Sequence, residues 1–110
     1  SGGMRGGEMR ADGSMTLSLN RGSDLFVDLV FRDDTGAPVD MTGHTIQIVE
    51  AEPWALANAS VAWVAQAAGS ARLRADWTPA APAETWVRLQ TTRTADGFDD
   101  AAPKLVVRWL

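Results

Sequence analysis

Short runs of alternating apolar and polar residues, separated by turn residues, constrain the fold of this chain most. In the clearest run, 25–32, every second residue from Leu25 to Phe31 is apolar and the residues between them are mixed. Neighbouring side chains of a strand point to opposite faces, so this alternation indicates a strand with one buried face. The sequence therefore predicts an all-β protein.

Seven such runs follow one another at short spacing. They cover residues 15–19, 25–32, 45–50, 61–66, 71–77, 85–92 and 105–110. Short strands with turn signals between them are typical of sandwiches, so we expect an immunoglobulin-like antiparallel β-sandwich of about seven strands. A small Greek-key barrel is the alternative architecture.

Residues 51–68 are ambiguous in this pattern. Pro53 stops the preceding strand, and the alanines that follow suit a helical turn. We prefer a loop followed by a strand at 61–66, because polar residues and Gly69 break the stretch into short pieces. A helix over 55–68 is the alternative. The preferred strand would pair with 71–77 across a short connection.

The chain begins with a Gly-rich, aperiodic stretch. We expect residues 1–13 to be a flexible N-terminal tail, in part an expression remnant, and 14–110 to form a single domain. No apolar run approaches the roughly 20 residues that cross a bilayer, and no signal-peptide pattern is present. We therefore expect no membrane partner.

Charge and cysteine content narrow the function further. The formal net charge is −4, and the ten basic residues are scattered along the chain. A nucleic-acid partner is not expected, since binding phosphates calls for a basic stripe. The absence of cysteine excludes disulfides and thiolate metal sites.

Catalytic chemistry finds little support in the sequence. His44 is the only histidine, so a catalytic triad would depend on it, and a structural role at a strand entrance is the simpler interpretation. The acidic pairs Asp33/Asp34 and Asp99/Asp100 lack the spacing of a calcium loop and are predicted to be solvated turn residues. We expect no catalytic residue, metal or cofactor.

Five tryptophans are many for a chain of this length. Three of them, Trp63, Trp77 and Trp109, lie on apolar faces and are expected in the core. Trp54 follows a proline in a loop, and Trp86 faces away from the apolar side of its strand. These two rings are candidate contact residues, as tryptophan favours interfaces. Val106 and Leu110 face away from the expected core and are candidates for an edge contact.

The segment from Arg21 to Ile48 carries a family resemblance. Arg21-Gly22-Ser23-Asp24 leads into an apolar strand, followed by Asp34-Thr35-Gly36-Ala37-Pro38-Val39-Asp40-Met41-Thr42-Gly43-His44-Thr45-Ile46. This order resembles small phage tail and baseplate proteins, above all the immunoglobulin-like N-terminal domain of baseplate upper proteins. Met41 replaces the usual leucine of that pattern, and His44 replaces the usual aromatic residue.

The resemblance implies a non-enzymatic structural component of a phage or prophage virion, assembled in the bacterial host cytoplasm. Such a protein would form homo-oligomers and dock on other tail or baseplate proteins. Two alternatives remain. One is a carbohydrate- or receptor-binding sandwich that uses Trp54 and Trp86 as stacking platforms, and the other is a capsid decoration protein.

Overall fold

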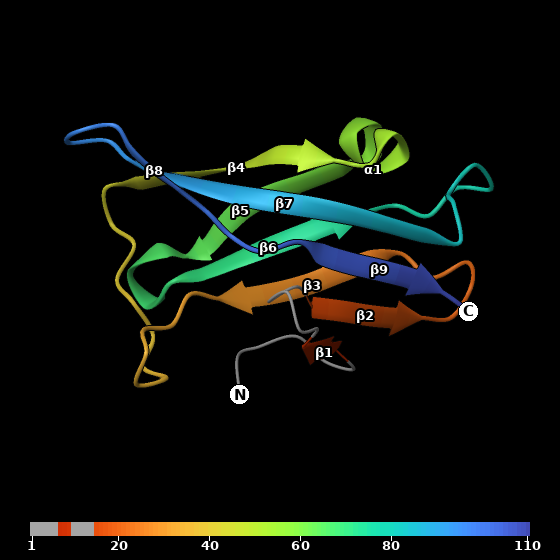
Figure 1. The fold of residues 1–110 in the computed structure, drawn as a ribbon, viewed down its shortest axis with the longest axis horizontal. Coiled ribbons are helices and arrows are strands. Elements are labelled where there is room, and N and C mark those ends of the chain that lie inside the picture. Colours follow the sequence, from red (N-terminus) through yellow and green to blue (C-terminus); the bar gives the residue numbers. More distant parts are fainter. Residues whose placement is uncertain (1–6, 10–14) are drawn as a thin grey trace.

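The computed structural model describes residues 7–9 and 15–110, which form two β-sheets (Figure 1). Sheet A contains, in order, β1 (Gly7–Met9), β2 (Met15–Leu19), β9 (Leu105–Trp109), β7 (Glu84–Arg93) and β4 (His44–Ala51), and β8 (Phe98–Ala101) also pairs with β7. Sheet B contains β3 (Leu25–Val30), β6 (Ser70–Ala75) and β5 (Ala59–Ala65). The prediction of a mostly β protein is confirmed.

One strand pair departs from the antiparallel arrangement predicted for the whole sandwich. β2 pairs with β9 in parallel, with Met15 opposite Leu105 and Leu19 opposite Trp109. Every other pair of strands in the described ranges is antiparallel. Alternation reveals which side chains are buried but not the direction of a neighbouring strand, so the sequence pattern could not distinguish the two.

The two sheets enclose one hydrophobic core. Every second residue of β6 and β7 points into it, including Leu73, Val87 and Leu89. The core also contains Leu17, Leu25, Val27, Trp54, Ala55, Ala75, Leu105, Val107 and Trp109. The predicted core position of Trp109 is therefore confirmed, and Trp77 packs against the same core while remaining half-buried.

The ambiguous stretch combines a short helix with a strand. α1 (Pro53–Asn58) begins with proline in its first turn, and the Glu52 carboxylate caps it by accepting from the amides of Trp54 and Ala55. β5 follows at once and pairs with β6 across the 3-10 turn η1 (Gln66–Ala68). The loop-and-strand prediction is confirmed in its strand, and the helix over 55–68 is wrong because pairing with β6 outweighs the helix propensity of alanine.

Two hairpins extend from the strands. The Asp33 hairpin comprises residues 31–39, between β3 and β4. Its Asp33 Oδ1 accepts from the Thr35 amide at 2.9 Å and from the Ala37 amide at 3.1 Å. Gly36 completes the turn with φ +86°. The predicted turn is thus confirmed, with Asp33 stabilising the backbone as expected.

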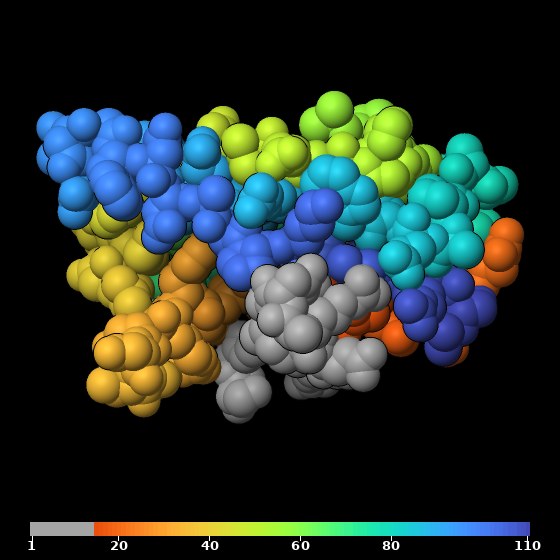
Figure 2. Space-filling view, in the orientation of Figure 1, coloured from red at the N-terminus to blue at the C-terminus, as the bar shows by residue number. Residues whose placement is uncertain are grey.

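The Phe98 hairpin comprises residues 93–101 and joins β7 to β8. Asp99 and Asp100 were predicted to be turn residues, but the turn ends at Gly97 and residues 98–101 form β8. β8 and β9 pair with successive parts of β7, and Pro103 lies in the break between them. This hairpin forms a projection at one end of the molecule (Figure 2, blue, upper left).

The segment expected to be a flexible tail lies only partly within the structure. Its residues Gly7–Met9 form β1, which pairs antiparallel with β2. The remaining residues of that prediction, and with them the suggested expression remnant, lie outside the described residues.

Candidate functional site

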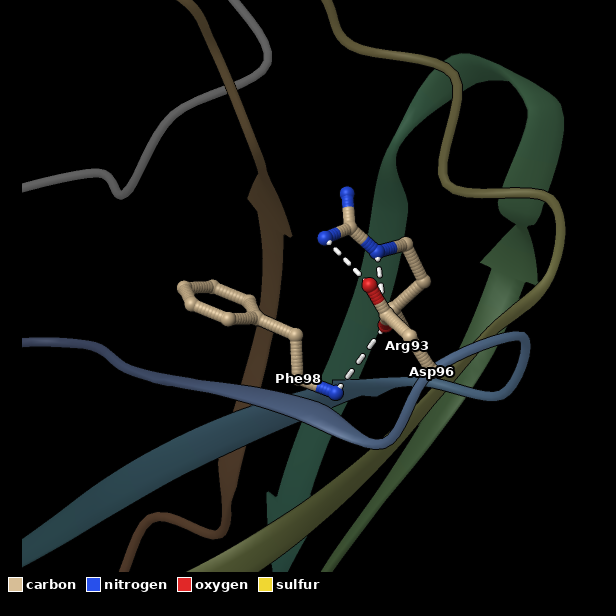
Figure 3. A network of polar contacts seen from close by, with 3 residues as sticks. All are labelled: Arg93, Asp96 and Phe98. Atoms are coloured by element: carbon tan, nitrogen blue, oxygen red, sulfur yellow. Dashed lines mark hydrogen bonds and ion pairs between the residues drawn. The ribbon is translucent and has the colours of Figure 1, made fainter.

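Phe98 is an exposed aromatic residue held in place by an ion pair. Its side chain is 59 % exposed on β8. Arg93 donates to the Asp96 carboxylate from Nε at 2.9 Å and from Nη2 at 2.8 Å, and the Phe98 amide donates to Asp96 Oδ1 at 3.1 Å (Figure 3). The Arg93 guanidinium also lies 5.3 Å from the centre of the phenyl ring. These contacts fix the ring in a solvent-exposed position.

The Asp96 carboxylate is the electrostatic centre of this group. The hydrogen bonds from Arg93, and secondarily the one from the Phe98 amide, lower the pKa of Asp96 below its ordinary value. Asp96 is therefore ionised at neutral pH, and the ion pair is present under ordinary conditions.

Phe26 is the second exposed aromatic residue with arginine stacked on it. It lies on the outer face of sheet B and is 57 % exposed. The guanidinium carbon of Arg72 lies 4.5 Å from the ring centre, and that of Arg74 lies 5.8 Å from it. Arg72 also makes a two-point ion pair with Asp28, with N–O distances of 2.8 and 3.2 Å. Both arginines therefore lean from β6 toward β3.

Because these arginines lean toward β3, the part of the outer face formed by β5 carries only short, uncharged side chains. Ser60 and Ala62 of β5 lie opposite Arg74 and Arg72 in register, and both are exposed. Val64, at the end of the same strand, is 50 % exposed. We call Ser60, Ala62 and Val64 the β5 shelf. Its floor is made of small or apolar side chains, and the two arginines border it on one side.

Trp54 is not the exposed contact residue that the sequence predicted. It lies in α1 and only 9 % of it is exposed. Its ring packs edge-on against Trp109 at 5.4 Å, and its Nε1 donates to Thr78 Oγ1 at 2.8 Å. Trp54 lies in α1, with its ring turned inward against Trp109. One of the two rings on which the glycan-binding alternative depends is therefore unavailable for stacking.

Trp86 and Val106 lie beside each other on the outer face of sheet A, paired in register between β7 and β9. Trp86 is half-buried, and Lys104 Nζ lies 4.2 Å from the centre of its ring. Val106 is directed away from the core between the sheets, as the sequence predicted, yet it is 95 % buried. It is thus not an open edge residue, because β9 lies between β2 and β7 and not at an edge.

Leu110 is the candidate interface residue that the structure leaves most open, at 69 % exposed. Its amide donates to the Leu19 carbonyl at 2.9 Å, which fixes the backbone while the side chain points outward.

His44 has a structural environment. It is half-buried, and its Nδ1 lies 3.3 Å from the Thr42 carbonyl. Its own carbonyl accepts from Trp63 Nε1 and Gln66 Nε2, which joins the start of β4 to the end of β5. In the part of the chain that the structure describes, no three His, Asp or Glu side chains come together as metal ligands would.

The two acidic pairs lie in different hairpins, Asp33/Asp34 in the Asp33 hairpin and Asp99/Asp100 in the Phe98 hairpin. Asp33 stabilises its turn, and its pKa is lowered by the Thr35 hydroxyl and by the Ala37 amide. Asp99 and Asp100 lie on β8 and not in a turn, with Asp99 accepting from Thr92 Oγ1 at 2.7 Å. Asp100 is exposed on the same face of β8 as Phe98, since alternate residues of a strand share a face.

Sequence reasoning missed both phenylalanines. The run around Phe26 was predicted as a strand whose second face is mixed, and the run at 71–77 was predicted as a separate strand. Pairing the two runs in register would have placed aromatic and cationic side chains together, because Phe26 lies opposite Arg74 and Asp28 opposite Arg72. Phe98 carried no such signal, since its strand was taken for a turn.

Comparison of the chain with family models, with curated proteins and with solved structures finds no match. Over residues 7–9 and 15–110, no helix has both the length and the apolar character needed to cross a membrane.

Proposed function

We propose that this chain is a non-enzymatic structural component of a phage or prophage virion. In this role it is a tail or baseplate assembly or adaptor protein that self-associates and docks on other tail proteins. The observation that carries the proposal is the pair of exposed phenylalanines, Phe26 and Phe98, each accompanied by arginine. Aromatic residues and arginine are enriched in protein interfaces. The fixed rings would lose little side-chain entropy on binding.

The form of the Arg21–Ile48 segment supports the virion context. This segment, which carries the resemblance to tail and baseplate proteins, runs through β3, the Asp33 hairpin and a connector into β4, and so passes from sheet B to sheet A. Met41, which replaces the usual leucine, is buried within the connector. A thioether of similar volume fills the same space, so the replacement is compatible with the pattern.

The strand order supports an immunoglobulin-like arrangement. Sheet B has the order β3-β6-β5, and β4, β7 and β9 are neighbours in sheet A. Counted along the chain from β2 as strand A, with the hairpin strand β8 left out, these correspond to strands B-E-D and C-F-G of a seven-stranded immunoglobulin sandwich. β2 departs from the simplest version because it joins β9 and not β3.

The test is direct binding to purified structural proteins encoded beside this gene. We expect at least one tail or baseplate protein to bind, and we expect Phe26→Ser or Phe98→Ser to weaken that binding about tenfold or more. Leu56→Ser is the matched control, since Leu56 is 62 % exposed and has no stacked cation. Binding only to capsid proteins would favour the decoration alternative. Binding to none, or equal binding by all three variants, would contradict the proposal.

A further inference from the structure

We propose that the Phe98 hairpin of one copy docks on the β5 shelf of a second copy, so that the chain associates head to tail. This inference rests on the self-association that the proposed function includes. It specifies which two surfaces of the molecule meet.

The Phe98 hairpin is exposed, and its strand β8 carries two negative charges, on Asp99 and Asp100. It projects from one end of the molecule (Figure 2), and all four residues of β8 are exposed. Phe98 and Asp100 share a face of this strand, about 7 Å apart along it. The ring is the apolar part of the contact. The carboxylate of Asp100 is the anionic part, and Asp99 adds a second negative charge on the opposite face.

The β5 shelf offers the complementary features at the same spacing. Ala62 provides an apolar floor, and the next exposed position along β5, Ser60, lies opposite Arg74. With Phe98 placed on Ala62, Asp100 would lie over Ser60, and the exposed Arg74 side chain would turn from Phe26 toward β5 to meet it. Arg74 is held less tightly than Arg72: its ion pair with Asp76 is long, at 3.8 Å, its guanidinium carbon is 5.8 Å from the Phe26 ring centre, and the Arg74 and Asp76 side chains are both largely exposed. Arg72 is instead occupied by Asp28.

The uncharged character of β5 argues against repulsion at this contact. No Asp, Glu, Lys or Arg occurs between Glu52 and Arg72, a stretch that contains all of α1, β5 and η1. Natural edge strands are commonly protected by charged residues or proline, and β5 has neither. An acidic hairpin can therefore approach the shelf without meeting a charge on β5, and the charged groups nearest to it are Arg72 and Arg74 of β6 with their carboxylate partners Asp28 and Asp76.

The two surfaces are different parts of the molecule, which fixes the symmetry. A contact between unlike surfaces is heterologous, and it closes into a ring or continues as a filament. A single contact of this size would be weak, with a dissociation constant in the micromolar range or above. Closure into a ring would strengthen the assembly, since each added copy then forms two contacts.

Charge reversal tests the contact through two variants that should fail alone and succeed together. We expect Asp100→Lys and Arg74→Glu each to weaken self-association about tenfold or more in sedimentation velocity across the micromolar range, since each places like charges in the contact. An equal mixture should associate like the unmodified chain. In the mixture, the lysine introduced at position 100 of one variant meets the glutamate introduced at position 74 of the other. The unmodified Asp100 of the second variant meets the unmodified Arg74 of the first, so both contacts are attractive.

The controls apply the same charge changes elsewhere. Asp34→Lys and Arg21→Glu alter exposed turn residues, and each should associate like the unmodified chain. Phe98→Ser provides a second variant that leaves the charges intact and should also weaken association about tenfold. Because the altered side chains are exposed, circular dichroism should show all variants folded.

Three results would overturn this inference: an unmodified chain that remains monomeric, association that neither charge reversal weakens, or no recovery on mixing. The docking part of the proposed function is tested separately. A chain that binds tail proteins but remains monomeric would refute the head-to-tail contact alone. A chain that passes the mixing test but binds no protein encoded beside it would retain the contact and lose the docking role.

Discussion

The Asp33 hairpin and the Phe98 hairpin have the same turn chemistry but different surroundings. In each, an aspartate accepts hydrogen bonds from the turn backbone and a glycine has positive φ, +86° at Gly36 and +72° at Gly97. The Asp33 hairpin lies against the backbone of another turn, with the Phe31 amide donating to the Gly69 carbonyl at 2.9 Å. The Phe98 hairpin is held at its base, where Thr94 donates to the Gly43 carbonyl, and is exposed beyond it.

This contrast shows that local turn chemistry does not determine whether a hairpin is structural or available for binding. The neighbours of the hairpin determine that. Gly69 lets the Asp33 hairpin approach closely, because a side chain at Gly69 would collide with the Val39 carbonyl oxygen. No comparable neighbour restrains Gly97.

Gly69→Ala should be the most damaging change. Gly69 has φ +68°, and a Cβ there would meet the Val39 oxygen and lie 3.1 Å from the Phe31 oxygen. Left-handed strain and the backbone collision together should lower the free energy of unfolding by about 3 kcal/mol, measured by urea denaturation. Gly97→Ala is the control, since its Cβ would meet nothing, and it should cost about 1 kcal/mol. Equal losses would refute the role assigned to the close approach.

Met41→Ala should be the next largest change. Met41 is buried, its amide donates to the Gln66 carbonyl at 3.0 Å, and its own carbonyl accepts from Gln66 Nε2. Removing the side chain leaves a cavity beneath the connector and should cost about 2 kcal/mol in thermal or urea unfolding. Met41→Leu should cost less than about 1.5 kcal/mol because it keeps the volume. A tolerated alanine would mean that the connector is not packed.

The two turn aspartates should respond differently to salt. Both have a lowered pKa, Asp33 mainly through the Thr35 hydroxyl and Asp96 mainly through Arg93. Raising the salt from about 0.1 M to about 1 M should raise the pKa of Asp96 more than that of Asp33, since ion pairs are screened more strongly than bonds from neutral donors. Carboxyl-carbon NMR titration measures both values. Equal salt responses would contradict the difference between the sites.

The sign of the pH effect on stability follows from the same shifts. A carboxylate whose pKa is lower in the folded state stabilises that state fully above its ordinary pKa of 3.8. The contribution disappears as the pH falls from there through the folded-state pKa. We therefore expect the free energy of unfolding to decline below about pH 4, and Asp33→Asn to make that decline shallower.

Phe98→Ser should have the smallest effect on stability. The ring is 59 % exposed, so its loss should change the free energy of unfolding by about 0.5 kcal/mol or less. Phe31→Ser is the matched change in the Asp33 hairpin. It removes an edge-on contact with Trp63 at 5.7 Å and should cost at least about 1 kcal/mol. A large loss from Phe98→Ser would show that the ring supports the fold.

The sequence predicted most strands because alternation reports burial directly. The runs at 15–19, 71–77 and 85–92 correspond to β2, β6 and β7 within two residues at each end. Alternation did not predict β8, whose four residues are all exposed and so have no buried face to mark them. It also did not predict the parallel neighbour of β9, which depends on contacts between residues about 90 positions apart.

The candidate surfaces were harder to predict than the strands. Trp54 was expected to be exposed, yet α1 turns it inward. The exposed rings are Phe26 and Phe98, and their exposure depends on which strands end a sheet or project beyond it. That information lies in the topology, which hydrophobic patterning does not contain.

The parallel pairing of β2 and β9 has a mechanical consequence. The ladder joins five residues of each strand, and the Met15 and Leu110 amides extend it with bonds to the Lys104 and Leu19 carbonyls. A force applied between residues 15 and 110 pulls two strands that point the same way in opposite directions. The bonds then bear the load together in shear instead of opening one after another. Single-molecule pulling should accordingly find more resistance along this line than between residues 84 and 110, which lie at the same end of the antiparallel β7–β9 ladder, so that this ladder would unzip.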